Sequence, residues 1–533
     1  MPMSTLSTIE YQTFYGVNYY LPADENEVIE LVNDAQKNNE IICVRGSGHS
    51  FPLINTLEQQ QSTATGRKYK FLMLSKMNKV DIQGDTVTVK AGCHLGKDPW
   101  DPTGYSTDEN SLLFQLDQQG LALPDLGGIS HQTVGGFLST ASSGGSVKYS
   151  FEDAIISVDI VTCQEGKGAA ITRFTRPEDD NPDDPFFGAG IATMGLFGVI
   201  VSATFKCIPN FYIKGSETTT TEAACAIDLF NESPTDLEAY LRNTDYARLM
   251  WWPQAGVTKM VVWEAFRTTY DDAIAWTNGE KGCRNRKDSG GNITQLRPYE
   301  EVPYIGCSPT PVTLAADLLF TAVGRWPVWV DDILANDPGF DKTFKNTVEE
   351  TFYPLILPGI LGIFVTDGVQ KFSDNWYEGL PMDNQMSDRL FPVWFTELWI
   401  PLENAADVMQ DLKAFYGENP SNAGTFSCEI YAAQSNNFWL SPSFNTDVIR
   451  IDVFWFGNNI GNPADYFNKF WQRLAKFNFR PHWGKYLPDA TGSLGVEYLE
   501  NLYPKWQDWK DLRQLMDPGE IFVNDYWRAH LGI

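Results

Sequence analysis

The stretch RGSGHS, Arg45–Ser50, is a glycine-rich turn that directly follows a short β-type run at Ile41–Val44. An amphipathic helix is predicted before it, because Asp24 and Glu27 form a capping box and apolar residues follow at helical spacing. The predicted order is therefore helix, strand and glycine turn. In such a turn the backbone N–H groups can approach an anion such as a pyrophosphate, although one turn of this kind is weak support by itself.

Further glycine-rich segments follow in the N-terminal part of the chain. Thr86–Gly92 alternates like a strand and ends in glycine, residues 126–145 are dominated by small side chains, and residues 188–207 lead from glycines into a β-branched strand. None of them contains the GxGxxG of a Rossmann unit or a Walker A loop, so neither nucleotide-binding fold is expected.

Length, charge and composition narrow the class of protein. A chain of 533 residues is expected to form two or more domains. Its formal net charge of −28 disfavours nucleic acids and anionic membrane surfaces as partners. The 8 cysteines are scattered without a CxxC and the 5 histidines are dispersed, so no metal site is expected. Without a signal-peptide pattern or a membrane-spanning run, we expect a cytoplasmic protein, and a secreted mature form stays open.

The order of the motifs resembles the vanillyl-alcohol-oxidase-type flavoproteins, and within them the aldonolactone and alditol oxidase group. The family's R-G-x-G-H-S turn, its TVxAG strand end and its small-residue loop all have counterparts here, as does an intact R-P-H-W-G-K near the end of the chain. The matching segments are Arg45–Ser50, Thr88–Gly92, Leu121–Ser130, Thr133–Gly145, Met194–Ile200, Arg480–Lys485 and Asp517–Asn524.

This resemblance implies an α+β protein. It predicts a PCMH-type FAD-binding domain of two α+β subdomains, and a cap domain with a large antiparallel sheet flanked by helices. The expected bounds are 1–210 for the FAD-binding domain, 211–479 for the cap and substrate-binding domain, and 480–533 for a C-terminal return to the FAD domain.

The resemblance also implies FAD as the cofactor, held covalently by an 8α-histidyl bond through His49. A second, cysteinyl bond is not expected, because residues 130–133 read Ser-His-Gln-Thr. The residues expected to bind FAD are His49, Arg45, Gly46, Ser47, Gly48, Ser50, Gly128, Ser130, Thr133, Gly135, Gly136, Ser139, Gly198, Val199, Ile200 and Lys485.

Five residues are candidates for catalysis. Glu429 and Asp452 are candidate bases on neighbouring strands, and Glu397 is a weaker one. Lys485 matches a lysine near the reduced flavin, where a cation stabilises developing negative charge. His482, three residues before it, could orient the substrate or relay a proton.

The chain also departs from the alditol-type pattern. Phe137, Tyr431 and Phe454 stand where polar side chains are expected, which predicts a substrate pocket that stacks a sugar ring or holds an apolar body. The long middle region, with Met250–Pro253 and residues 302–329, looks like the larger cap of the covalent, type II cholesterol oxidases.

The function expected from the sequence is an FAD-dependent oxidase. It would oxidise a CH–OH group of a sugar-like or bulky alcohol by hydride transfer to flavin N5 and reduce O2 to H2O2. The alternatives are a dehydrogenase of the same family with another electron acceptor, a sterol-type alcohol oxidase, and a flavin-fold binding or storage protein. The expected partners are a small-molecule alcohol and O2.

Overall fold

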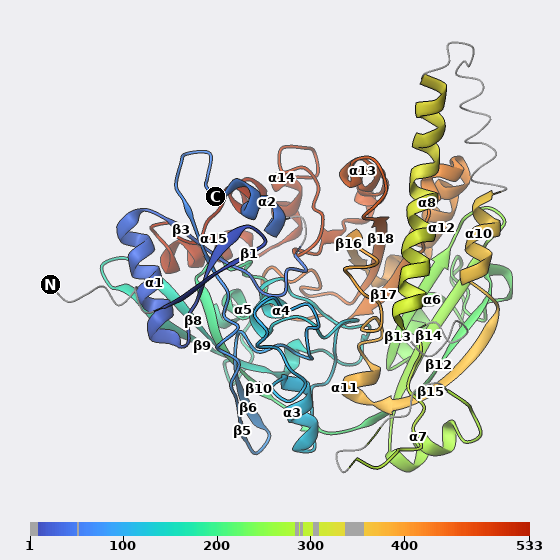
Figure 1. Cartoon of the computed structure of the whole chain (residues 1–533), viewed down its shortest axis with the longest axis horizontal. Coiled ribbons are helices and arrows are strands. Elements are labelled where there is room, and N and C mark those ends of the chain that lie inside the picture. Colours follow the sequence, from blue (N-terminus) through green and yellow to red (C-terminus); the bar gives the residue numbers. More distant parts are fainter. Residues whose placement is uncertain (1–8, 51–52, 283–286, 288–290, 302–308, 336–355) are drawn as a thin grey trace.

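The computed structural model describes residues 9–50, 53–282, 287, 291–301, 309–335 and 356–533. Two halves lie side by side in Figure 1. One half is built from the N-terminal strands together with the C-terminal helices, and the other surrounds a large sheet formed by the middle of the chain. Helices and strands are mixed in both halves, so the α+β class expected from the sequence is confirmed.

The first half contains a four-stranded sheet, a five-stranded sheet and a two-stranded sheet of β7, Leu121–Ala122, and β11, Ile208–Pro209. In the four-stranded sheet, of order β1-β2-β4-β3, both β2 and β3 run parallel to β4. The five-stranded sheet, of order β5-β6-β10-β8-β9, is antiparallel throughout. In chain order the strands of these two larger sheets are β1 Glu10–Phe14, β2 Val17–Leu21, β3 Ile41–Val44, β4 Tyr69–Leu72, β5 Val80–Gln83, β6 Thr86–Lys90, β8 Ile155–Gln164, β9 Gly168–Thr175 and β10 Val199–Lys206.

The predicted capping box opens helix α1, Glu25–Asn38. The Asp24 carboxylate accepts the Asn26 and Glu27 N–H groups at 2.9 and 3.1 Å, and the Glu27 carboxylate accepts the Ala23 N–H at 2.7 Å. The apolar stripe of α1 is fully buried in the core of this half. Its other helices are α2 Leu53–Gln60, α3 Leu112–Gln118, α4 Val134–Ser139, α5 Pro185–Ala189, α14 Val496–Leu502, α15 Trp506–Met516 and α16 Asp525–Leu531.

The second half is organised by an eight-stranded sheet of order β15-β12-β14-β13-β17-β18-β16-β19. All of its strand pairs are antiparallel. In chain order the strands are β12 Tyr212–Thr221, β13 Tyr246–Trp252, β14 Lys259–Thr268, β15 Gly368–Asn375, β16 Val393–Pro401, β17 Cys428–Ala433, β18 Val448–Phe456 and β19 Arg480–Pro481.

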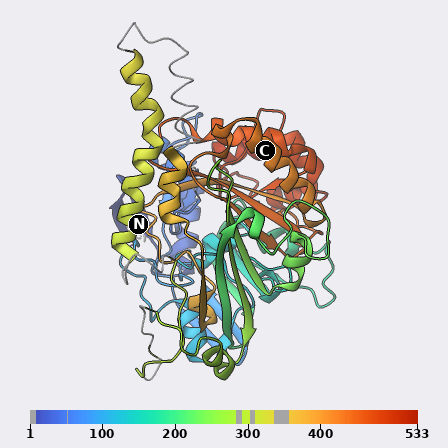
Figure 2. The same ribbon diagram turned by 90° about the vertical axis from the view of Figure 1, so that its right-hand side faces the viewer.

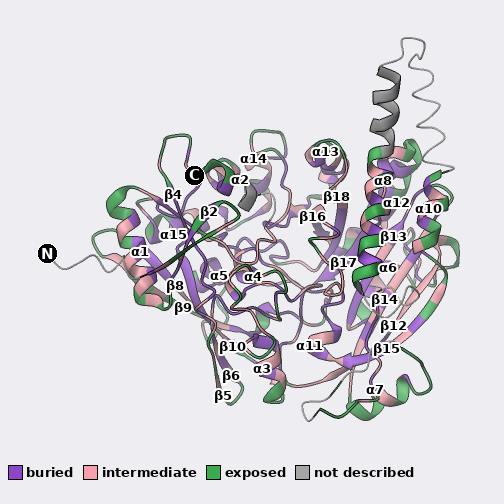
Figure 3. Ribbon diagram, in the orientation of Figure 1, coloured by how far each residue is buried: buried purple, intermediate pink, exposed green. Residues whose placement is uncertain are grey.

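The two faces of this sheet differ in chemistry, because side chains alternate along each strand. On β18, Ile449, Ile451 and Val453 enter an apolar core shared with helices α6 Leu237–Asn243, α12 Ala405–Glu418 and α13 Pro463–Leu474. Arg450 and Asp452 point to the opposite face and are nevertheless buried. β17 is buried along its length and β18 is buried from Val448 to Val453, as Figure 3 shows, so the polar face is covered as well.

Two further helices stand on the outer side of the cap. Helices α8, Pro309–Ala335, and α10, Leu357–Phe364, share one apolar cluster, and α8 extends beyond the body of the molecule (Figures 1 and 2). Among the described residues, no helix combines the length and the apolar composition needed to cross a membrane. The remaining helices of this half are α7 Tyr270–Trp276 and α11 Trp376–Gly379.

A buried turn joins the C-terminal segment to the first half. The Asp517 carboxylate accepts the N–H groups of Ile521 and Phe522 at 2.9 and 3.0 Å, and the Ile521 carbonyl accepts the N–H of Ile42 at 2.8 Å. Strand β3, which leads into the RGSGHS turn, therefore pairs with β4 of the N-terminal part and also binds the C-terminal segment at Ile521.

Candidate active site

The glycine-rich segments of the first half meet around one cavity. Its lining extends from the Arg45–Ser50 turn to Lys485 and Trp527, as a site for an extended ligand would. Of the residues expected to bind FAD, those that line it are Arg45, Gly46, Ser47, Gly48, His49, Ser50, Thr133, Gly135, Gly136, Ser139, Gly198, Val199, Ile200 and Lys485. Segments more than 400 residues apart in the sequence, from Arg45 to Lys485, thus form one wall.

The backbone at this wall requires glycine at particular positions. Gly48 has φ +88°, and a Cβ there would lie 2.4 Å from the Arg45 guanidinium. A Cβ at Gly46 would lie 2.6 Å from Thr133 Oγ1. The turn therefore brings bare backbone to the cavity, as a pyrophosphate-binding loop requires. The residues present fit FAD.

Gly128 and Ser130 are not among the residues that line this cavity, and their expected role in binding FAD stays a prediction. The Gly128 carbonyl accepts the Asp383 N–H at 2.8 Å. The Ser130 N–H and hydroxyl bind the side chain of Asn384 at 2.9 and 2.8 Å. Both residues therefore join the first half to the segment 383–391 of the cap.

Lys485 and His482 enter the cavity from the loop that follows β19. The Lys485 ammonium lies 4.0 Å from the centre of the Phe395 ring, and burial lowers its pKa while Glu397 opposes that shift. Burial lowers the pKa of His482 to about 4, so the ring is neutral at pH 7. Its Nδ1 accepts the Gly484 N–H at 3.0 Å, which leaves the ring proton on Nε2.

The candidate carboxylates form a row across neighbouring strands of the cap sheet. Asp452 is in register with Glu429 on β17 and with Glu397 on β16, and the Glu397 carbonyl accepts the His482 N–H at 3.0 Å. All three carboxylates are buried. The row thus runs toward the loop that carries Lys485.

Burial separates the protonation states of these carboxylates. It raises the pKa of Glu429 to about 8 and that of Asp452 well above its usual value. Glu397 differs because it pairs with the Arg450 guanidinium at 2.7 Å, and the pKa of Glu397 is lowered in spite of its burial. Glu397 is therefore ionised at neutral pH, whereas burial favours the protonated form of Asp452.

A second buried ionic cluster surrounds Arg248 on β13. Its guanidinium pairs with Asp383 and lies 3.6 Å from Glu429 and 3.8 Å from Glu217. Burial raises the pKa of Glu217. This cluster could not be predicted from sequence patterns, because Arg248 and Asp383 lie 135 residues apart.

The three aromatic residues expected in the substrate pocket lie in different environments. Phe137 is only 1% exposed and packs edge-on against Phe151 in the core beneath α4, so its expected role in the substrate pocket stays a prediction. Tyr431 lies under the Arg450 guanidinium, within the polar sheet face. Phe454 stacks near Phe395, and Phe395 in turn contacts Lys485. The sheet face near the cavity is thus more strongly charged than the sequence predicted.

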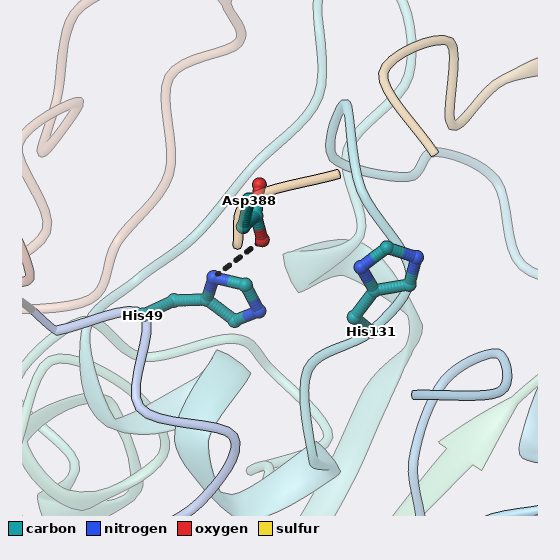
Figure 4. Close-up of side chains that lie close together, drawn as sticks. All are labelled: His49, His131 and Asp388. Atoms are coloured by element: carbon teal, nitrogen blue, oxygen red, sulfur yellow. Dashed lines mark ion pairs between the residues drawn. The ribbon is translucent and has the colours of Figure 1, made fainter. Parts of the chain in front are cut away.

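The histidines are also less dispersed than the sequence indicated. The rings of His49 and His131 lie 6.4 Å apart, centre to centre, and His49 Nδ1 is 3.6 Å from the carboxylate of Asp388 (Figure 4). Burial lowers the pKa of His49 to about 4, and Lys485 adds to that effect. His94 lines the cavity and lies 3.6 Å from the Asp98 carboxylate.

Known proteins match most of the length of this chain. The family described as D-arabinono-1,4-lactone oxidase matches residues 342–530. L-gulonolactone oxidase of Mus musculus is 22% identical over 95% of this chain and 93% of its own length. D-arabinono-1,4-lactone oxidase of Kluyveromyces lactis is 28% identical over 97% of this chain and 94% of its own length.

Among solved structures, cholesterol oxidase from B. sterolicum superimposes with a TM-score of 0.66, at 15% identity, over 100% of this chain and 99% of that protein. Chitooligosaccharide oxidase superimposes with a TM-score of 0.57, at 13% identity, over 98% and 97%. These likenesses confirm the PCMH-type FAD-binding fold with its cap sheet.

Fold and relatives define the class, an FAD-dependent oxidoreductase that acts on CH–OH groups with oxygen as acceptor. Within that class the chain is similar to the aldonolactone oxidases along almost its full length, which confirms the resemblance expected from the sequence.

Proposed function

We propose that this protein oxidises a secondary CH–OH group of a neutral, polyhydroxylated substrate such as an aldonolactone, with FAD bound covalently through His49. The observation that carries the proposal is the junction at Lys485, where the cavity lined by the glycine turns approaches the buried carboxylates of the cap sheet. A hydroxyl placed at this junction would face both a cofactor and titratable groups. We keep the bounds 1–210, 211–479 and 480–533 as the proposed domain division.

The proposed FAD site uses bare backbone and one neutral imidazole. Bound FAD would supply the hydride acceptor. The Arg45–Ser50 turn, with residues of α4 and the start of β10, would hold it. At neutral pH the low pKa of His49 leaves a lone pair on its ring, as a nucleophile needs.

Glu429 is the proposed base for the substrate hydroxyl. Its pKa of about 8 is close to the working pH, which favours proton transfer in both directions. Burial favours the protonated form of Asp452, which would donate a hydrogen bond to the substrate. His482 would donate through Nε2, since its Nδ1 already accepts an N–H. Lys485 would stabilise negative charge that develops on the flavin.

The charge balance of the cap face supports a neutral substrate. Arg450 is paired with Glu397, and Arg248 with Asp383. Neither guanidinium is therefore available to bind a carboxylate or phosphate group of a substrate, whereas the surrounding carboxylates and Tyr431 can bind hydroxyls. This chemistry favours a lactone or polyol over an aldonic acid, and over a sterol body.

The experiment combines flavin analysis with a substrate panel. The protein is precipitated with acid, and the visible spectrum of the pellet is recorded for wild type and His49→Ala. A yellow wild-type pellet and a colourless His49→Ala pellet support covalent attachment through His49. A colourless wild-type pellet with a yellow supernatant would show that FAD is bound without a covalent bond to His49. Anaerobic bleaching is then measured with 1,4-lactones, the matching aldonic acids, alditols and cholesterol.

Bleaching by lactones or polyols but not by the acids, followed by recolouring and H2O2 release in air, is the expected result. Bleaching by cholesterol would support the sterol oxidase instead. Bleaching without recolouring in air would assign a dehydrogenase, and no flavin in any fraction after reconstitution would contradict the proposed cofactor.

A further inference from the structure

Asp388 brings a carboxylate of the cap to the histidine of the RGSGHS turn. Its Oδ2 lies 3.6 Å from His49 Nδ1, and in Figure 4 the side chain stands between the imidazoles of His49 and His131. One nitrogen or oxygen atom from each of these three residues lies within 4.8 Å of the others. The three come from separate segments of the chain, so only the folded protein assembles the group.

The cap segment that carries Asp388 is fixed on the first half. The Asp383 N–H donates to the Gly128 carbonyl at 2.8 Å, and Asn384 binds both the N–H and the hydroxyl of Ser130. Ser130 directly precedes His131. A turn also encloses Asp388, because the carbonyl of the preceding residue, Ser387, accepts the N–H groups of Leu390 and Phe391 at 3.0 and 2.7 Å. These contacts hold Asp388 beside the turn.

The charges around His49 explain why a carboxylate beside its ring matters for a reaction of the imidazole. Near the imidazole lie Lys485 and Arg45, both cations, and His94 and Asp98, which interact with each other. A bond from the ring to an electrophile would create a positive imidazolium beside those cations. Asp388 is within reach of the ring proton, and such contacts commonly shorten when the ligand binds. His131 is 5% exposed, and its Nδ1 has no hydrogen-bond partner among the described residues.

We propose that Asp388 positions His49 and takes up its imidazole proton while the bond to FAD forms. The proposal rests on the covalent attachment put forward above. In the overall step, one C–H bond of the flavin 8α-methyl group and one imidazole N–H bond are lost and a C–N bond is made. The ring system takes up the two electrons and, in net terms, the two protons, and so ends reduced. Molecular oxygen then reoxidises it and leaves as H2O2.

The test follows bond formation directly. Apoprotein produced under riboflavin starvation is mixed with FAD in air, and the fraction of flavin that stays with acid-precipitated protein is recorded against time. The variants are Asp388→Asn, which keeps the shape of the side chain, and Asp388→Ala, which opens space for a small carboxylate. Asp367→Ala removes a cap carboxylate that is 61% exposed and distant in sequence from His49, and serves as the matched control.

We expect attachment to slow by about 100-fold or more in both Asp388 variants, the scale of a lost general base. Non-covalent FAD binding and melting temperature should stay near those of wild type. Added acetate should accelerate attachment in Asp388→Ala and leave Asp388→Asn unchanged, because the Asp388 side chain is 51% exposed and its place is open to solvent. A purely structural role would not respond to acetate.

Each contrary result has a distinct meaning. Wild-type rates in both Asp388 variants overturn the inference and leave the covalent bond in place. If wild-type protein binds FAD but never forms the covalent bond, both the proposed attachment through His49 and this inference are wrong. Stoichiometric zinc in purified protein, lost in Asp388→Ala, would assign the three residues to a metal ion and also overturn the inference.

Discussion

The guanidinium of Arg450 lies 4.8 Å from the centre of the Tyr431 ring, and the two residues are in register on neighbouring strands. Tyr431 stands at a position where the family resemblance led us to expect a polar side chain. Here β18 supplies an arginine to the same part of the sheet face. The aromatic side chain of β17 is therefore paired with a cation from the neighbouring strand.

Arg450→Met should strongly destabilise the protein. The substitution leaves Glu397 buried without its partner, and breaking a buried ion pair in this way costs about 3–5 kcal/mol. The melting temperature measures the effect. Arg473→Met, which breaks the more exposed pair with Asp411, should cost much less. Addition of Glu397→Gln to Arg450→Met should recover part of the loss, and an unchanged melting temperature in Arg450→Met would contradict the pairing.

Glu429 should give the reaction its pH dependence. Because the base must be ionised and its pKa is about 8, kcat/KM should rise with pH and level off above pH 8. In Glu429→Gln this rise should disappear and kcat fall by about 100-fold or more. Flavin content reports whether the variant still binds its cofactor. A pH profile that Glu429→Gln leaves intact would assign the base elsewhere in the carboxylate row.

Lys485→Met should lower kcat by about 100- to 1000-fold, the cost of removing one group that stabilises charge in the transition state. Lys485→Arg keeps the cation and should recover part of the rate. Stopped-flow reduction of the flavin under anaerobic conditions isolates this step from the reaction with oxygen. Equal rates of flavin reduction in the methionine variant and wild type would remove Lys485 from the chemistry.

Gly48→Ala should abolish FAD binding. Its φ of +88° is strained for alanine, and the new methyl would lie 2.4 Å from the Arg45 guanidinium. Gly16→Ala is the matched control, since Gly16 has φ +76° with nothing within 4 Å of the added carbon. It should cost only the left-handed strain, about 1–2 kcal/mol. Fluorescence titration of apoprotein with FAD compares the two variants, and equal binding would contradict the proposed role of the turn.

The sequence by itself determined the local elements and the class of cofactor fold. The capping box at Asp24 and Glu27 and the glycine turn at Arg45–Ser50 depend on interactions between near neighbours, and each formed as predicted. Turn conformation, helix capping and strand alternation are set within a few residues, so motif order was sufficient for the fold and for most of the residues that line the cavity.

Only the tertiary structure decided which side chains meet and which keep their protons. Strand register places Arg450 beside Tyr431, and Phe137 is buried in the core. The cap segment 383–391 brought Asp388 to His49. Contacts of this kind join residues hundreds of positions apart, and pKa values follow from burial and from the nearest charge. Neither these long-range contacts nor the pKa values can be predicted from sequence patterns, because both depend on neighbours that only the folded chain brings together.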